Sequence, residues 1–169
     1  MPPITLLPGL ACDAELWRDQ MAALSPRYPV HVADVHMRFA TLPQMAEALL
    51  AEQPGELLLC GASMGGMLAL EVVRQAPRRV KALALLGSTA RPDTPEQIRL
   101  RSDALALFAQ GRLREVLQAN LFFAFDPAHA RALAPDYLAM VERAGAAQLM
   151  AQNRAVMARA DQRPLLPTI

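Results

Sequence analysis

The chain has 169 residues, of which 53% are hydrophobic and 20% are charged. This length and composition provide for one globular domain with a sizeable core and exclude a disordered chain. Lysine and arginine number 17 and aspartate and glutamate 16, so the net charge is only +1. Such a balance gives no long-range field that favours nucleic acid or an anionic membrane. We therefore expect a small, neutral or modestly charged ligand.

The two cysteines and the hydropathy of the chain indicate in which cellular compartment the protein is expected. Cys12 and Cys60 lie in different segments without metal-type spacing, and the first residues do not resemble a secretory leader. No apolar run approaches the roughly 20 residues that cross a bilayer. We expect a cytoplasmic protein that binds no metal or other cofactor.

The first 90 residues alternate between short apolar runs and amphipathic stretches. Strands are expected at residues 4–7, 30–33, 56–60 and 80–86, and helices at residues 14–24, 42–52 and 64–75. Thr41 and Gln44 resemble a capping box at the start of the second helix. The helix over 64–75 is almost wholly apolar, which indicates deep burial. Four strands that alternate with helices are typical of a parallel sheet with right-handed crossovers, so we predict an α/β fold for residues 1–90.

From residue 91 to residue 162 the pattern is helical throughout, and we predict a helical lid or cap there. Thr94 and Asp126 are predicted to open helices, and Pro135 is predicted to mark a further helix start. The apolar first half of this segment is expected to face substrate; it holds four of the five phenylalanines, which are Phe108, Phe122, Phe123 and Phe125. Residues 163–169 are expected to be a linker toward further core.

The sequence Gly61-Ala62-Ser63-Met64-Gly65-Gly66 lies between a predicted strand and a predicted helix. A serine on such a turn is held in a strained conformation with its hydroxyl exposed. Because strand and helix must approach each other closely, Gly61 and Gly65 meet a steric requirement, and Gly66 allows still closer packing. Ser63 is therefore predicted to be a catalytic nucleophile.

Two backbone amides are predicted to form an oxyanion hole beside this serine. The Met64 amide lies at a helix N-terminus, where unpaired N–H groups and the helix dipole favour negative charge. The loop after the first strand should meet the same edge of the sheet, and Leu10 is expected to supply the second N–H.

These features together resemble the α/β-hydrolase superfamily over residues 4–90. The residues that carry the resemblance are Leu7-Pro8-Gly9, Trp17, Gly61 to Gly66 and Leu83 to Gly87. The helical stretch after residue 90 lies where this family inserts its lid. In the family the triad acid and then the histidine follow the serine along the chain. The resemblance therefore implies that both partners of Ser63 come after Ile169, and that residues 1–169 lack part of the hydrolase core.

Other titratable groups of the chain are possible partners of Ser63. His31, His36 and His129 each have an ordinary structural explanation, with His36 the best placed of the three at a strand end. Asp34 and Asp93 follow strands as well, but solvated loop carboxylates are the more common case. Cys12 and Cys60 are interpreted as packing residues.

We therefore predict a serine hydrolase that acts on a carboxylic ester, thioester or lactone through an acyl-enzyme, and that residues 1–169 alone are inactive. An acyltransferase with the same turn and a non-catalytic binding protein stay open as alternatives. A nucleotide site is disfavoured because G-x-G-x-x-G is absent. A sheet that ends at residues 80–86 exposes an unpaired edge, which predicts an oligomer or another partner along that strand.

Overall fold

The computed structural model of the chain describes residues 2–169, except for the side chains of Asn120, Phe122, Phe123 and Ala124. Four strands and their connecting helices form the first half, and three long helices dominate the second. In chain order the elements are β1 (Ile4–Leu7), η1 (Ala14–Trp17), α1 (Arg18–Leu24), β2 (Val30–Val32), α2 (Val35–Arg38), α3 (Leu42–Glu52), β3 (Leu57–Ala62), α4 (Met64–Gln75), η2 (Pro77–Arg79), β4 (Val80–Leu86), α5 (Pro95–Ala109), α6 (Leu113–Ala124), α7 (Pro127–Met157) and η3 (Arg163–Thr168).

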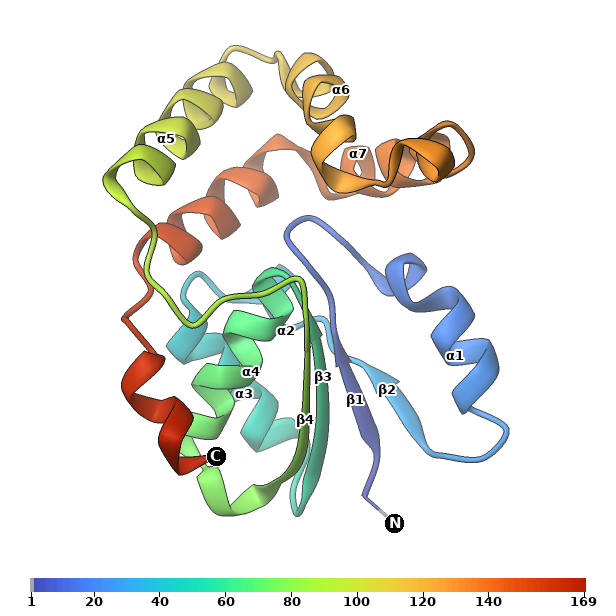
Figure 1. The fold of residues 1–169 in the computed structure, drawn as a ribbon, viewed down its shortest axis with the longest axis vertical. Coiled ribbons are helices and arrows are strands. Elements are labelled where there is room, and N and C mark those ends of the chain that lie inside the picture. Colours follow the sequence, from blue (N-terminus) through green and yellow to red (C-terminus); the bar gives the residue numbers. More distant parts are fainter. Residues whose placement is uncertain (1) are drawn as a thin grey trace.

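The four strands form one parallel sheet in the order β2-β1-β3-β4. Helices α2, α3 and α4 lie on one side of the sheet and α1 lies on the other (Figure 1). This arrangement confirms the predicted α/β fold with its parallel sheet. All strands therefore point their carboxyl ends toward the same edge, where the loops after β1 and β3 meet.

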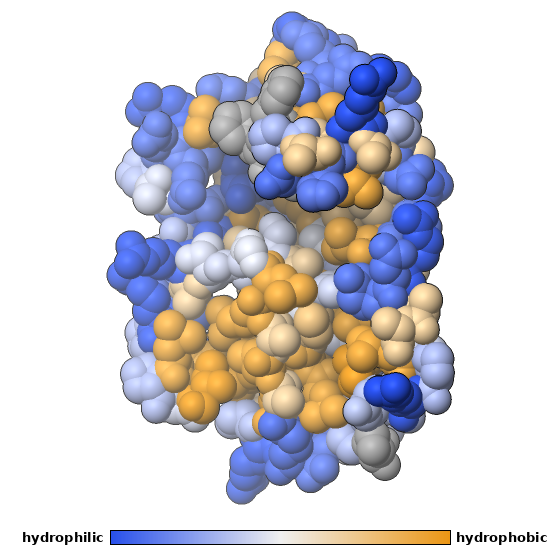
Figure 2. Space-filling model, turned by 45° about the vertical axis from the view of Figure 1, so that its right-hand side comes forward, coloured by the Kyte–Doolittle hydropathy of each residue, from blue (hydrophilic) through white to orange (hydrophobic). Residues whose placement is uncertain are grey.

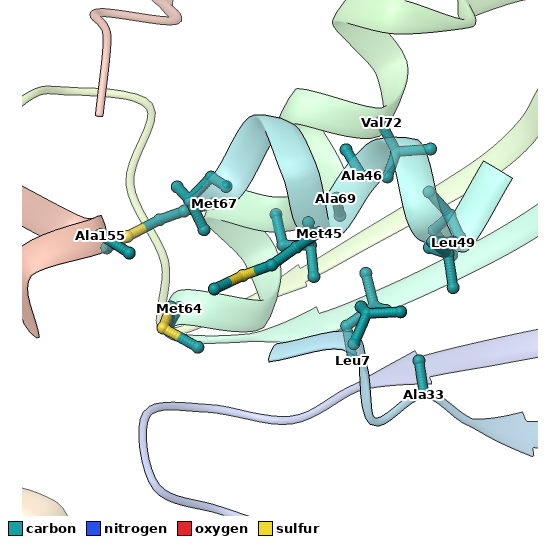
Figure 3. Packing of buried hydrophobic residues seen from close by; sticks show 14 of the residues in the cluster. Leu7, Ala33, Met45, Ala46, Leu49, Met64, Met67, Ala69, Val72 and Ala155 are labelled. Atoms are coloured by element: carbon teal, nitrogen blue, oxygen red, sulfur yellow. The ribbon is translucent and has the colours of Figure 1, made fainter. Parts of the chain in front are cut away.

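The core lies between the sheet and the α3–α4 layer. Leu42, Met45 and Leu49 of α3 are buried as their helical spacing predicts, and α4 is buried over most of its length. Figure 3 shows that these side chains pack against Leu7 of β1, and that Met67 of α4 points toward Ala155 of α7. One cluster of apolar side chains thus joins the sheet to the last long helix.

Two of the predicted helix N-caps are present in the structure. The Thr41 hydroxyl accepts a hydrogen bond from the Gln44 amide, and Thr94 and Gln97 form a complete capping box at the start of α5. The segment predicted as one helix over 14–24 instead begins as the 3₁₀ turn η1, capped by the Asp13 carboxylate, before α1 continues.

Helices α5, α6 and α7 form a cap over the carboxyl ends of the strands (Figure 1). Asp126 caps the start of α7 as predicted, but Pro135 begins no new helix and lies inside α7. The interruption of α7 occurs at Gly145 instead, where φ is 78° and ψ is 167°. Glycine reaches this conformation without a Cβ clash, whereas the missing N–H and the ring of Pro135 are accommodated in a helix that continues around them. The predicted use of residues 91–162 as a lid stays a prediction.

Strand β4 lies at the edge of the described sheet, as the sequence predicts. Leu85 and Leu86 are exposed on it, by 39% and 50%. Figure 2 shows a broad area of apolar side chains on the lower, sheet-containing half of the molecule. A partner that covers this edge stays a prediction. No helix of residues 2–169 is long and apolar enough to cross a membrane.

Candidate active site at the strand β3 to helix α4 turn

Ser63 occupies a sharp turn between β3 and α4. Its φ of 51° and ψ of −113° lie in a region that non-glycine residues rarely enter, and its side chain is exposed. Neighbouring groups hold this backbone: the Ser63 amide donates to the Leu86 carbonyl oxygen at 2.9 Å, and the Ser88 hydroxyl donates to the Ser63 carbonyl oxygen at 2.8 Å. The turn therefore places the Ser63 hydroxyl at the carboxyl edge of the sheet.

The three glycines around Ser63 are where strand and helix come closest. A Cβ on Gly61 would lie 2.3 Å from the Gly65 oxygen, and one on Gly65 would lie 2.0 Å from the Leu7 oxygen. A Cβ on Gly66 would lie 2.5 Å from the Ser88 side chain. The sequence prediction of a tight turn depends on such close approaches, because a residue with a Cβ would not fit at these positions.

The loop after β1 and the start of α4 contribute backbone amides to the same cavity. Leu10 and Met64 both line it together with Ser63. Neither the Leu10 N–H nor the Met64 N–H donates a hydrogen bond within residues 2–169. Unpaired amides beside a hydroxyl can stabilise negative charge that develops on an oxygen. Their use as an oxyanion hole stays a prediction.

A glutamine of α7 fixes the loop that carries Leu10. Gln152 is fully buried, and its Oε1 accepts a hydrogen bond from the Ala11 amide at 2.6 Å. Its Nε2 donates to the His36 carbonyl oxygen at 3.0 Å. Ala11 itself has a positive φ of 58°, which an alanine adopts only when its surroundings hold it. Gln152 thus ties the cap to a strained residue next to Leu10.

The cavity above Ser63 has a volume of about 640 Å³ and lies between the turn and the cap. Its walls are largely apolar, and Phe108, Leu117 and Val141 of the cap line it. Phe108 of the predicted apolar substrate side therefore lines the cavity, whereas Phe125 is not among the lining residues. That this side faces substrate stays a prediction. The side chains of Phe122 and Phe123, which the same prediction included, lie outside the described residues.

The histidines of the chain do not meet Ser63. His31 and His129 are exposed, and His36 is buried with its Nε2 at 2.7 Å from the Cys12 carbonyl oxygen. Because a carbonyl oxygen only accepts, Nε2 of His36 is the protonated nitrogen and holds the loop after β1. Within the described residues no histidine side chain hydrogen-bonds to the Ser63 hydroxyl.

Burial of His36 predicts a pH dependence of stability. Loss of hydration lowers the pKa of His36 below its usual value of 6.5, although the Cys12 carbonyl, Asp34 and Asp13 oppose that shift. The unfolded chain therefore binds the proton more readily, and stability is lost as pH falls below the unfolded pKa, by at most about 1.4 kcal/mol per pH unit.

Urea unfolding at pH values from neutral to about pH 5.5 measures this effect. We expect the free energy of unfolding to fall in this window for the natural chain and to fall less for His36→Gln, whose amide keeps a donor for Cys12. Parallel curves for the two proteins would contradict the assignment.

The remaining titratable candidates have structural roles. Burial, with a further contribution from Asp13, raises the pKa of the Cys12 thiol to about 12, so it stays protonated at neutral pH. Burial likewise raises the pKa of Cys60. Asp34 is exposed and pairs with Arg38. The interpretation of both cysteines as packing residues agrees with these positions.

Asp93 is not the solvated loop carboxylate that the sequence suggested. Its side chain is 2% exposed, accepts a hydrogen bond from Arg101 at 2.7 Å and forms an ion pair with Arg159 at 2.8 Å. The correction has a physical reason: a loop carboxylate can be buried when two guanidinium groups replace its hydration. Arg101 also donates to the Asn153 amide oxygen at 2.8 Å, and both of these residues line the cavity above Ser63.

Sequence reasoning missed Gln152, Asn153 and Arg101. A weak signal existed for the first two, because they interrupt the apolar stripe between Leu149 and Val156 on a helix face that must be buried. Arg101 gave no signal, since nothing in the sequence separates it from other arginines of the same helix. Within residues 2–169, no three histidine, cysteine, aspartate or glutamate side chains lie together in a way that could hold a metal ion.

Comparisons with known proteins agree with this geometry. The family model described as "alpha/beta hydrolase fold" matches residues 2–163. A pimeloyl-[acyl-carrier protein] methyl ester esterase of Nitrosomonas europaea is 31% identical over 128 residues, which are 69% of this chain and 50% of that protein. The chain thus spans about half the length of this curated relative.

Solved structures show the same fold. An enol-lactonase from Burkholderia xenovorans is 25% identical with a TM-score of 0.82, over 99% of this chain and 69% of that one. A thermophilic esterase from Thermogutta terrifontis has a TM-score of 0.81 at 22% identity, over 99% of this chain and 68% of that one. With a family match over nearly its whole length, a parallel sheet of the same arrangement and a strained serine at the β3–α4 turn, the chain belongs to the alpha/beta hydrolase fold family.

Proposed function

We propose that this chain supplies the nucleophile of a serine hydrolase that acts on a carboxylic ester, thioester or lactone. The observation that carries the proposal is the exposed Ser63 on its strained turn, in one cavity with the unpaired amides of Leu10 and Met64. The names of an esterase, a methyl ester esterase and an enol-lactonase among the similar proteins support this class of reaction.

In the proposed reaction the Ser63 oxygen attacks the acyl carbon while its proton passes to a general base. The Leu10 and Met64 amides stabilise the oxyanion of the tetrahedral intermediate. The alcohol, thiol or ring oxygen then leaves with that proton, and an acyl-enzyme on Ser63 remains. Water, deprotonated by the same base, attacks the acyl carbon and releases the acid together with free serine.

The base in this proposal is a histidine oriented by a carboxylate, and both come from sequence outside residues 1–169. The family's chain order, with acid and histidine after the serine, supports this source. The positions of His31, His36 and His129 agree with it, because none bonds to the serine hydroxyl. Residues 1–169 alone are then expected to be slower than the complete enzyme by about three or more orders of magnitude.

A fluorophosphonate probe tests the proposal on the protein at its full natural length. We expect covalent labelling, located on Ser63 by peptide mass spectrometry, and complete loss of labelling in Ser63→Ala. Ser102→Ala is the matched control, since this exposed serine of α5 bonds only to the Ile98 carbonyl oxygen. Labelling that persists in Ser63→Ala would refute the nucleophile.

Two other functions use the same turn and can be separated from hydrolysis. An acyltransferase would consume the substrate faster when an alcohol or thiol acceptor is added, and the acyl group would appear on that acceptor. A binding protein would take up an ester stoichiometrically without labelling or turnover. The unpaired amides beside Ser63 favour the acyl-transfer chemistry that hydrolase and acyltransferase share.

A further inference from the structure

The cavity above Ser63 has a single fixed charge in its wall. Arg101 is the one charged residue among the described residues that line it, and no aspartate, glutamate, lysine or histidine is present there. Most of the other lining groups are apolar side chains or backbone. A buried apolar wall weakens screening, so one guanidinium has a large effect on which ligands bind.

The charge of Arg101 exceeds what Asp93 requires. Arg159 already pairs with this carboxylate at 2.8 Å, and its side chain is only 4% exposed. Arg101 adds a second cation at 2.7 Å, with a side chain that is 29% exposed. The cluster of Asp93, Arg101 and Arg159 therefore carries a net positive charge, and its more accessible member is the one that lines the cavity.

The guanidinium of Arg101 is oriented and still has donors to offer. Its Nε donates to Asp93 and one terminal nitrogen donates to Asn153 at 2.8 Å. The other terminal nitrogen makes no hydrogen bond within residues 2–169. A guanidinium held at two corners loses little conformational entropy when it binds a ligand, and its planar N–H groups match a carboxylate.

We propose that Arg101 binds a carboxylate on the substrate, so that the enzyme prefers esters whose acyl group carries a second, ionised acid. This inference rests on the proposed hydrolase function and deepens it. The apolar walls hold the carbon chain between the two ends, Ser63 meets the ester, and Arg101 meets the acid. Within the predicted range of neutral or modestly charged ligands, this proposal selects those with one negative charge.

The test measures kcat/KM of the full-length protein for two matched series. One series is the monomethyl esters of succinic, glutaric, adipic and pimelic acid; the other is the methyl esters of unbranched monocarboxylic acids of matching length. We expect preference for at least one acid ester, and we expect Arg101→Gln to reduce the acid-to-neutral ratio by about 10- to 100-fold. Arg101→Lys keeps a cation beside Asp93 but lacks the planar set of N–H donors of a guanidinium, so it should give an intermediate ratio.

Arg99→Gln is the matched control, because Arg99 is an exposed residue of the same helix that does not line the cavity. Its ratio should equal that of the natural protein. A ratio that is the same in Arg101→Gln, Arg101→Lys and the natural protein overturns the proposal, while hydrolysis of neutral esters in that case leaves the proposed function intact.

Binding provides a readout that does not depend on turnover. In a Ser63→Ala background, calorimetric titration with monomethyl adipate should give a Kd that Arg101→Gln raises by about tenfold or more and that Arg99→Gln leaves unchanged. An unchanged Kd in Arg101→Gln overturns the carboxylate site even if no ester is hydrolysed, so the two proposals fail separately.

Discussion

Replacing Gly65 by alanine is expected to prevent the chain from reaching this fold in stable form. The added Cβ would lie 2.0 Å from the Leu7 oxygen and 2.7 Å from the Pro8 oxygen. Both are backbone atoms at the end of the central strand β1, which cannot rotate away as a side chain could. The helix and the sheet would have to separate, and we expect a loss of more than about 3 kcal/mol in the free energy of unfolding.

Urea or thermal unfolding followed by circular dichroism measures this loss. Gly9→Ala is the matched control: a Cβ there would meet its nearest atoms at 3.5 and 3.6 Å, which is ordinary contact, and its φ is not positive. We expect this control to change stability by less than about 1 kcal/mol. Similar midpoints for Gly65→Ala and the natural chain would contradict the close approach of α4 to β1.

The first half of the fold could be predicted because its signals are local. Continuous apolar runs, Thr41 at a helix start and the glycines around Ser63 each reflect a requirement that a few neighbouring residues satisfy. The turn is the strongest of these signals, since a serine with φ of 51° needs glycine neighbours and leaves their pattern in the sequence.

The errors arose where a local signal was overruled or was absent. Proline is typical of a helix start, but the residues on both sides of Pro135 stay helical. Gly145 interrupts α7 because a glycine can adopt a positive φ. The burial of Asp93 depends on Arg101 and on Arg159, which follows 66 positions later in the chain. No pattern in the neighbourhood of Asp93 could have revealed those partners.

The contact between Gln152 and Ala11 is likewise non-local, and it predicts the second large effect. Replacing Gln152 by methionine keeps the length of the side chain but leaves the buried Ala11 amide without an acceptor. An unpaired buried donor costs about 1–3 kcal/mol, and the strained backbone of Ala11 loses the group that holds it. We expect the loop with Leu10 to relax, so that the Leu10 N–H no longer holds the position that the proposed function requires beside the oxyanion.

For the full-length enzyme under the proposed function, this change should lower kcat about 10- to 100-fold while KM changes little, because an oxyanion donor acts on the transition state and not on the bound ester. Gln152 is a positioning residue in this argument, and Gln148→Met is its control. Gln148 also donates to the His36 carbonyl oxygen, at 2.9 Å, but makes no bond to Ala11.

The pair of variants thus separates two contributions. Both remove a hydrogen bond to His36, so a loss of stability that they share reports on that contact. Only Gln152→Met frees the Ala11 amide, so a fall in kcat specific to it reports on the loop. If both variants lower kcat equally, the cap stabilises the site only through general packing, and Gln152 has no special part in holding the loop that carries Leu10 and Ala11.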